Sequence, residues 1–193
     1  MRVIAGTAGG IRLNAPKTAV RPTMDRVKAA IFSSLGEEII GARVLDLFAG
    51  TGALGIEALS RGAASALFVE DNAQAITAIE QNLKRTKLEG EIRRQDVFTF
   101  LRSNQPSKPF QIIFADPPYE KTKSGERYTG LLLENQPLTE MLTASGIFVL
   151  EKRPTEQMPR TPLWNVIRAR AYGATEVLFL QHAIAATVTA SLE

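Results

Sequence analysis

The sequence predicts an α/β fold, in which helices cover both faces of a doubly wound, mixed sheet of seven strands. Strand-like apolar runs alternate with helical segments through the middle of the chain, and a glycine-rich turn follows the first run. Such alternation is typical of parallel sheets with helical crossovers. Two further runs near the end flank a single glycine and indicate an antiparallel hairpin, so we expect a mixed sheet.

The expected strands are short and rich in Val, Ile, Leu and Phe. Five of them lie at Arg43–Phe48, Ala66–Glu70, Glu91–Arg93, Gln111–Ala115 and Gly146–Leu150. Helices are expected at Ala53–Ser60, Asn72–Arg85, Val97–Arg102 and Leu131–Leu142. Pro137 should kink or divide the last helix. The final strands, Val166–Tyr172 and Thr175–Leu180, meet at Gly173 and form the predicted hairpin.

A basic extension precedes this core. Val3–Ala5 and Ile11–Leu13 flank a glycine-containing turn and predict a small hairpin. A helix over Met24–Leu35 follows, with Thr23 as its N-cap and Gly36 at its end. Residues 1–30 hold one acid, Asp25, against the six basic residues Arg2, Arg12, Lys17, Arg21, Arg26 and Lys28. This bias favours an anionic partner, although a basic stretch is often only a solvated face.

Length and composition bound the remaining possibilities. The 193 residues predict a single domain, with residues 1–36 as the extension, 43–180 as the core and 182–193 as a tail. The chain has no Cys and one His, His182, which excludes thiolate zinc sites, cysteine nucleophiles and multi-histidine metal centres. No apolar run reaches the ~18 residues of a membrane span, and the start lacks a secretory signal. We therefore expect a cytoplasmic protein with neither a metal nor a membrane partner.

The turn after the first core strand, Asp46–Gly55, contains the pattern GxGxxG at Gly50, Gly52 and Gly55. This pattern indicates a nucleotide-type ligand that approaches bare backbone, either a dinucleotide or S-adenosylmethionine. A carboxylate at Asp46 would repel a pyrophosphate but suits a ligand with an ammonium and a sulfonium. The alternative is a tight turn in which Asp46 is a local cap. Glu70 and Asp96 end the next two strand regions, where such sheets bind ligands, although each could also serve as a solvated or capping acid.

The tetrapeptide Asp116-Pro117-Pro118-Tyr119 follows the fourth strand. A structural interpretation, a proline-stiffened loop, explains the prolines but not the acid and the aromatic residue. An exocyclic amino group on a base attacks a methyl group only when its lone pair is withdrawn from the ring. The Asp116 carboxylate and the Pro117 carbonyl could accept its two hydrogens, and the prolines would fix both acceptors. Tyr119 could stack on an extruded base.

These motifs together resemble the RsmD family, the bacterial 16S rRNA guanine-N2 methyltransferases of the Rossmann-like class I fold. The resemblance covers residues 2 to about 180 and rests on Arg2–Gly6, Arg21–Val27, Asp46–Gly55 with Glu57–Ala63, Asp116–Tyr119 and Tyr172-Gly173. It implies S-adenosylmethionine as the cofactor, with its methionine end at Asp46, Gly50 and Gly52, its ribose at Glu70, and its adenine at Asp96 and the Val97 backbone. Thr23 would lie near the cofactor carboxylate, and Asp116, Pro117 and Tyr119 would hold the guanine.

The resemblance also implies 16S rRNA as the partner, within a small-subunit assembly intermediate. The expected RNA contacts are Arg2, Arg12, Lys17, Arg21 and Arg26. The family's first hairpin usually has basic residues around its glycine, whereas this chain has Gly9, Gly10 and Ile11 before Arg12.

Three alternatives remain open: an adenine-N6 methyltransferase acting on DNA or RNA, a dinucleotide-dependent oxidoreductase, and a non-enzymatic RNA-binding assembly factor. Hydrogen bonding favours guanine over adenine, because guanine N2 lies beside a second donor, N1–H, and an ionised carboxylate only accepts.

Overall fold

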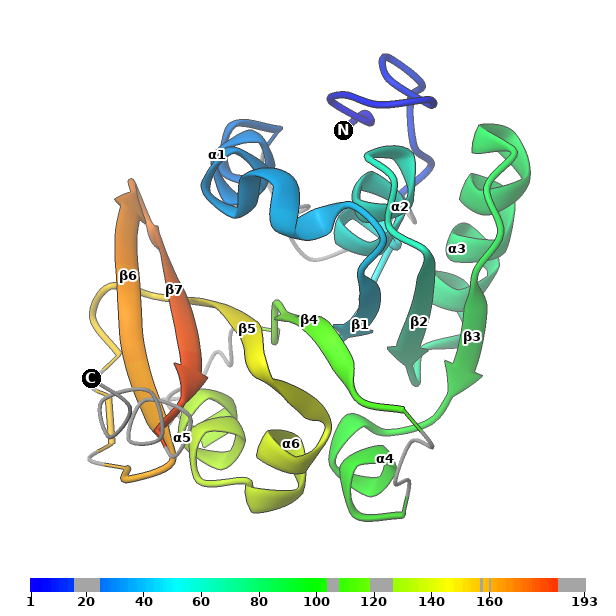
Figure 1. Cartoon of the computed structure of the whole chain (residues 1–193). Coiled ribbons are helices and arrows are strands. Elements are labelled where there is room, and N and C mark those ends of the chain that lie inside the picture. The colour runs from blue at the N-terminus through cyan, green and yellow to red at the C-terminus, as the bar shows by residue number, and fades with distance from the viewer. Residues whose placement is uncertain (16–24, 104–107, 119–126, 157, 160, 184–193) are drawn as a thin grey trace. The chain divides into compact units, whose positions relative to one another are not determined.

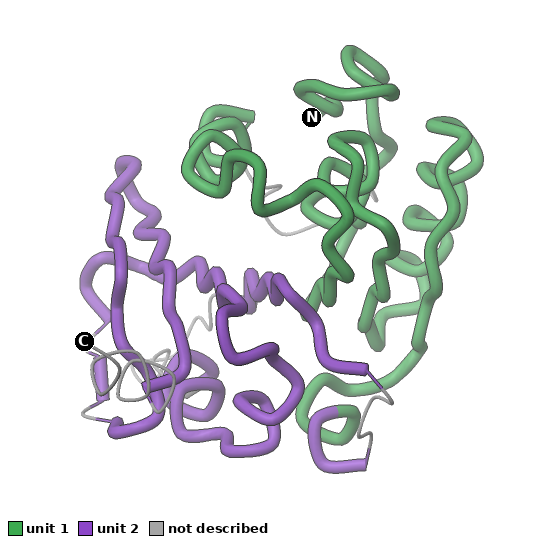
Figure 2. The backbone as a smooth tube through the Cα atoms, viewed as in Figure 1, with its two compact units in different colours: residues 1–100 green, residues 101–193 purple. Residues whose placement is uncertain are grey.

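The computed structural model describes residues 1–15, 25–103, 108–118, 127–156, 158–159 and 161–183. The chain divides into two compact units, residues 1–100 and residues 101–193 (Figure 2). Its strands follow the order β3-β2-β1-β4-β5-β7-β6 in a seven-stranded mixed sheet (Figure 1). The predicted fold class is therefore confirmed.

The first unit contains the N-terminal segment and three parallel strands. Its elements are α1 (Asp25–Leu35), a short 3-10 helix (Gly36–Ile39), β1 (Arg43–Leu47), α2 (Ala53–Ser60), β2 (Ser65–Glu70), α3 (Ala73–Thr86) and β3 (Glu91–Arg94). Helix α4 (Val97–Ser103) begins near the end of this unit. β2 pairs in parallel with β1 on one side and β3 on the other, which places the carboxyl ends of the three strands at one edge of the sheet.

Local sequence explains the bounds of these helices. Asn72 accepts hydrogen bonds from the N–H groups of Gln74 and Ala75 and so caps α3. Helix α2 packs against β1 and β2 and buries seven of its eight residues, all except Leu59. Its bounds match the prediction, and those of α3 differ from it by one residue at each end.

The second unit contains β4 (Phe110–Ala115), α5 (Arg127–Leu133), α6 (Gln136–Glu140), β5 (Leu142–Lys152), β6 (Trp164–Tyr172) and β7 (Thr175–His182). β4 and β5 are parallel, whereas β7 is antiparallel to both β5 and β6, so the C-terminal hairpin is confirmed.

The region predicted as one helix over Leu131–Leu142 contains two. α5 begins before that range, and α6 starts beside Pro137, after Asn135 caps it through the Leu138 N–H. The expected division at Pro137 is confirmed, because proline is tolerated in the first turn of a helix but not in its interior. The predicted start of the next strand at Gly146 was wrong, since β5 begins at Leu142.

The predicted N-terminal hairpin is present, but without a ladder of paired strands. Its two arms are joined by the isolated bridge Arg2↔Arg12 and by the bonds Val3 N–H to Ile11 O and Gly10 N–H to Val3 O, and neither arm is an extended strand. The reason is that the N–H groups of Ile4 and Ala5 donate to the Glu57 side chain of α2.

In the part of the chain that the structure describes, no helix is long and apolar enough to cross a membrane. The same residues include no cluster of three or more His, Cys, Asp or Glu side chains that could hold a metal ion.

Candidate functional site

The glycine turn between β1 and α2 has an unusual backbone. Phe48, Gly50 and Gly52 have φ angles of 55°, 55° and 76°, in the left-handed region. A β-carbon added at Gly50 would meet only the Phe48 carbonyl oxygen, at 3.9 Å. A ligand can therefore approach the backbone at Gly50, which is the role that the pattern predicts for a glycine there.

Asp46 lies beneath this turn. Its side chain is buried, and Oδ2 accepts a hydrogen bond of 2.9 Å from the Gly55 N–H in the first turn of α2. A β-carbon at Gly55 would stand 2.3 Å from the Phe68 ring, so Gly55 permits close packing of the helix on β2. The local capping role considered for Asp46 is therefore present, and it places the side chain at the N-terminal end of α2.

Glu70, at the end of β2, reaches the same turn. Its Oε2 accepts from the Gly50 N–H at 2.8 Å, and its Oε1 accepts from the N–H groups of Asp71 and Asn72 at 3.1 and 3.0 Å. The structure thus brings two of the predicted cofactor residues, Glu70 and Gly50, into direct contact. A carboxylate offers about four acceptor positions, so these three bonds leave capacity for a ligand hydroxyl.

Asp96 follows β3 and stands at the start of α4. Its Oδ1 accepts from the Thr99 N–H at 2.8 Å, so Asp96 caps the helix, as the simpler interpretation expected. Gln95 donates its N–H to the Glu70 carbonyl oxygen at 3.0 Å, which ties this segment to the end of β2. The rings of Phe98 and Phe48 also meet edge to face, with centroids 6.1 Å apart. The Asp96 segment therefore adjoins the glycine turn, and Val97 is buried beside it.

Asn82 of α3 holds the glycine turn in place through hydrogen bonds. This residue was not identified from the sequence. Its buried side chain donates to the Thr51 carbonyl oxygen at 2.9 Å and to the Asn14 carbonyl oxygen at 3.0 Å. It also accepts from the Asn14 N–H at 2.7 Å. One amide thus links the glycine turn to the segment that leaves the N-terminal hairpin.

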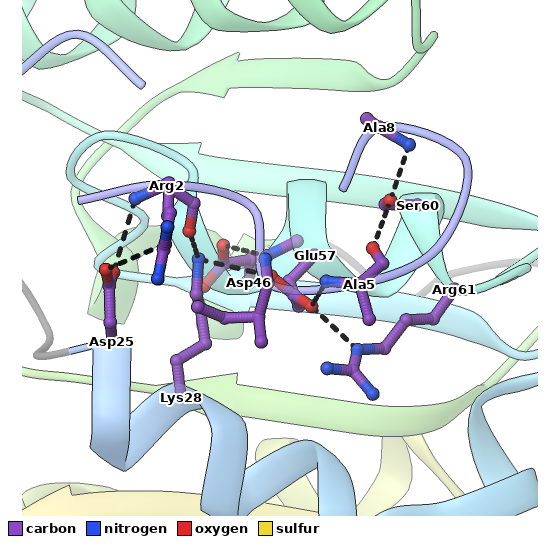
Figure 3. Close-up of polar contacts among 11 residues, drawn as sticks. Arg2, Ala5, Ala8, Asp25, Lys28, Asp46, Glu57, Ser60 and Arg61 are labelled. Carbon is purple, nitrogen blue, oxygen red and sulfur yellow. Dashed lines mark hydrogen bonds and ion pairs between the residues drawn. The ribbon is translucent and has the colours of Figure 1, made fainter. Parts of the chain in front are cut away.

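Glu57 was missed as well. It is fully buried in α2, and its carboxylate lies 3.2 Å from the Lys28 Nζ and 2.7 Å from the Arg61 Nε (Figure 3). Burial lowers the pKa of Lys28 from its ordinary value, and the attraction of Glu57 opposes that shift. The signal in the sequence was an acid inside the otherwise apolar run of residues 53–59.

The predicted RNA-contacting residues have different surroundings. Arg12 and Arg26 are exposed. Arg2 is exposed too, but it pairs with Asp25: its Nε lies 3.7 Å from Oδ2, and its backbone N–H donates to Oδ1 at 3.2 Å. Lys17 and Arg21 lie outside the described residues, as does the predicted cofactor residue Thr23.

In the second unit, Asp116 and Pro117 directly follow β4. The Asp116 side chain is half-buried and Pro117 is buried. Tyr119, the predicted stacking residue, lies outside the described residues.

The family model described as "Conserved hypothetical protein 95" matches residues 1–181. The chain is 40% identical over 182 residues to YlbH of Bacillus subtilis, provisionally named an rRNA methyltransferase, and the match covers 92% of this chain and 96% of that protein. It is 33% identical over 179 residues to ribosomal RNA small subunit methyltransferase D of Escherichia coli K12, covering 90% of this chain and 85% of that protein.

Solved structures are similar along most of the chain. The Escherichia coli protein yhhF, provisionally named a methyltransferase, matches with a TM-score of 0.77 and 32% identity over 94% of this chain and 97% of that one. The 16S rRNA N2 G1207 methyltransferase RsmC of T. thermophilus, solved with AdoMet and guanosine, has a TM-score of 0.64 and 22% identity, covering 86% of this chain and 44% of that one. The latter likeness shows a shared fold.

Proposed function

Because this chain belongs to the RsmD family, we propose that it transfers a methyl group from S-adenosylmethionine to the exocyclic N2 of a guanine in 16S ribosomal RNA. Relatives named as small-subunit rRNA methyltransferases support methylation of rRNA. The choice of N2 of guanine is supported by the residue types of the Asp116 turn. The proposal further assigns the reaction to the cytoplasm and to a small-subunit assembly intermediate.

The buried Asp46 carboxylate is the observation that carries the cofactor class. It stands at the N-terminal turn of α2, where a dinucleotide-binding site would receive a pyrophosphate. An ionised carboxylate there would repel phosphate and attract a ligand that bears an ammonium and a sulfonium. The residues therefore fit S-adenosylmethionine better than a nicotinamide or flavin dinucleotide.

The surrounding residues fit the other parts of this cofactor. The open backbone at Gly50 admits the methionine end, and Glu70 has acceptor capacity for the ribose hydroxyls. Asp96 and the Val97 backbone, next to the Phe48–Phe98 pair, would receive the adenine. When bound, S-adenosylmethionine supplies an electrophilic methyl carbon on a positively charged sulfur.

Asp116 and Pro117 would prepare the guanine amino group for attack. In the proposed transfer, the N2 lone pair forms the new bond to the methyl carbon, the carbon–sulfur bond breaks, and its electron pair stays on sulfur. N2 must then release one proton. The Asp116 carboxylate accepts a hydrogen bond from one N2–H, takes up that proton on transfer and passes it to solvent, while the Pro117 carbonyl accepts a hydrogen bond from the other N2–H. Because N1–H is also a donor, an ionised carboxylate suits the guanine edge better than the adenine edge.

Two measurements test this proposal. S-adenosylmethionine and S-adenosylhomocysteine should raise the melting temperature by mass action, and NAD should not. Incubation of unmodified 16S rRNA, alone and within small-subunit particles, with isotopically labelled cofactor should give labelled N2-methylguanosine after digestion and mass spectrometry. Stabilisation by NAD alone would overturn the cofactor class. Label found only in N6-methyladenosine would instead support the adenine alternative, and RNA binding without any label would indicate the assembly factor.

A further inference from the structure

We propose that α2 positions the N-terminal hairpin, residues 1–13, for binding RNA, with Glu57 and Ser60 as the positioning residues. This inference rests on the proposed function, because it assigns α2 a role toward the RNA substrate. It differs from that function in predicting that loss of the contacts between α2 and the hairpin weakens RNA binding and leaves cofactor affinity unchanged. All of its residues lie within the first unit.

Glu57 holds the hairpin by its backbone. The carboxylate accepts from the Ile4 N–H at 2.7 Å and from the Ala5 N–H at 3.0 Å, across more than fifty residues of sequence. Lys28 lies against the same carboxylate and donates to the Arg2 carbonyl oxygen (Figure 3). The shape of the first arm is therefore set by a side chain of α2 and not by a strand ladder.

Ser60, one turn further along α2, holds the tip. Its Oγ donates to the Ala5 carbonyl oxygen at 2.6 Å and accepts from the Ala8 N–H at 2.9 Å, as Figure 3 shows. Its carbonyl oxygen accepts from the Thr7 N–H at 2.8 Å. At Gly6 the approach is so close that an added β-carbon would stand 1.8 Å from the Ser60 carbonyl oxygen. The hairpin can dock only because residue 6 has no side chain.

A gain in folding stability does not explain why a buried ion pair holds the hairpin on α2. Burying the Lys28–Glu57 pair removes two charges from water, and well-packed apolar residues often replace such pairs without loss of stability. The charged arrangement instead fixes the orientation of the hairpin, because the Glu57 carboxylate holds the N–H groups of Ile4 and Ala5 in defined positions. Residues 1–15 contain no acid, and Arg12 is exposed on this hairpin, so the element held in place is one that suits a phosphate backbone.

Helix α2 also connects to the proposed cofactor site. Gly52 of the glycine turn is the N-cap residue of α2, and Asn82 joins that turn to Asn14. The hairpin and the proposed cofactor turn are thus attached to the same two helices, α2 and α3. An RNA held by the hairpin would have a defined position relative to that turn.

Two glycines of the hairpin provide a matched test. Gly6 and Gly10 have nearly equal left-handed φ angles, 82° and 85°, but an added β-carbon at Gly10 would meet no atom within 4 Å. Gly6→Ala should displace the hairpin from α2, whereas Gly10→Ala adds similar backbone strain without a clash. We expect Gly6→Ala to raise the KM for small-subunit particles about tenfold or more, because misplacement of a binding element by about 1 Å has large effects. The Kd for S-adenosylmethionine should stay within about twofold of wild type, and Gly10→Ala should have a much smaller effect on KM.

Ser60→Ala is the second variant, and it decides the matter if Gly6→Ala does not fold. It removes the two hydrogen bonds of the Ser60 Oγ and leaves the Thr7 N–H bond to the residue-60 carbonyl and the charges at Glu57 in place, so KM for the particles should rise while cofactor affinity persists. Unchanged KM in both folded variants, or a KM rise in Gly10→Ala equal to that in Gly6→Ala, would overturn the proposal. A rise in cofactor Kd that matches the rise in KM would overturn it too. Absence of methylation by the wild-type protein would instead contradict the proposed function, and this control separates the two failures.

Discussion

The glycine turn and the Asp116 turn are held by different means. The glycine turn adopts three left-handed φ angles and is kept in place by Asp46 at its start and by two side chains distant in sequence, Glu70 and Asn82. At the Asp116 turn, Pro117 and Pro118 restrict the backbone covalently, since the proline ring fixes φ near about −65°. Substitutions far along the chain should therefore reach the glycine turn, whereas the two prolines restrict the backbone of the Asp116 turn within its own sequence.

The largest effect should come from Asp116→Ala. Loss of one preorganised acceptor at a reacting centre lowers rates by about 10²–10³, so single-turnover methyl transfer should fall by that factor or more. The cofactor Kd, measured by calorimetry, should stay within about twofold of wild type. Wild-type turnover in this variant would return the Pro-Pro turn to a structural role.

Glu70→Ala should affect the opposite property. It removes the acceptor for the Gly50 N–H and the proposed acceptor for the ribose hydroxyls, and hydrogen bonds to charged groups contribute about 1.5–3 kcal/mol. We expect the cofactor Kd to rise by about 10- to 100-fold, with little change in RNA affinity. Asp71→Asn is the matched control, because Asp71 is exposed and contacts Glu70 through its backbone N–H. Equal losses in both variants would contradict a specific role for Glu70.

Asn82→Ala tests whether a remote residue reaches the glycine turn. It leaves the Thr51 carbonyl oxygen without this buried donor, which should lower the free energy of unfolding by about 1–3 kcal/mol. The cofactor Kd should rise by a few fold. Gln81→Ala is the control. Gln81 is an exposed neighbour of Asn82, and among the contacts described its side chain accepts only from the exposed Asn14 amide. This substitution should change neither the free energy of unfolding nor the cofactor Kd. If Asn82→Ala lowers stability and leaves the cofactor Kd unchanged, the glycine turn does not depend on α3.

The smallest effect should appear in the pH dependence of stability. Because burial lowers the pKa of Lys28 in the folded chain, the unfolded chain binds more protons between that lowered pKa and the ordinary value of 10.5. The contribution of Lys28 to the free energy of unfolding should therefore increase as the pH rises through this interval and level off above it. Urea unfolding at several alkaline pH values, compared with Lys28→Met, isolates this contribution. A difference between the two proteins that does not change with pH would contradict the shift.

Local patterns in the sequence predicted much of the fold and one part of the site. The bounds of α2 follow from its glycine turn and its apolar composition, and Gly173 marks the final hairpin. Glu70 and Asp96 were expected at the carboxyl ends of neighbouring strands, and the bond from Gln95 to Glu70 confirms that these ends adjoin. These features depend on neighbours in sequence or on the regular geometry of parallel strands.

The remaining features depend on contacts between distant residues. Asn82 meets Asn14 across 68 positions, and Glu57 meets Ile4 across 53, so no window of local sequence contains both partners. The same contact explains why the predicted N-terminal hairpin has one isolated bridge and no strand ladder: Val3–Ala5 has the apolar character of a strand, but two of its N–H groups donate to Glu57. The sequence shows an acid, Glu57, in an apolar helix, but it does not show which distant residues contact that acid.

The long reach of Glu57 has a consequence for synthesis of the chain. Ile4 and Ala5 leave the ribosome before Glu57, because the carboxylate that receives their N–H groups is more than fifty residues behind. At about 5–20 residues per second, that carboxylate is made roughly 3–10 s later. The N-terminal hairpin must therefore wait for α2 before it can take its final shape, and it is completed only after the glycine turn that precedes α2 has been translated.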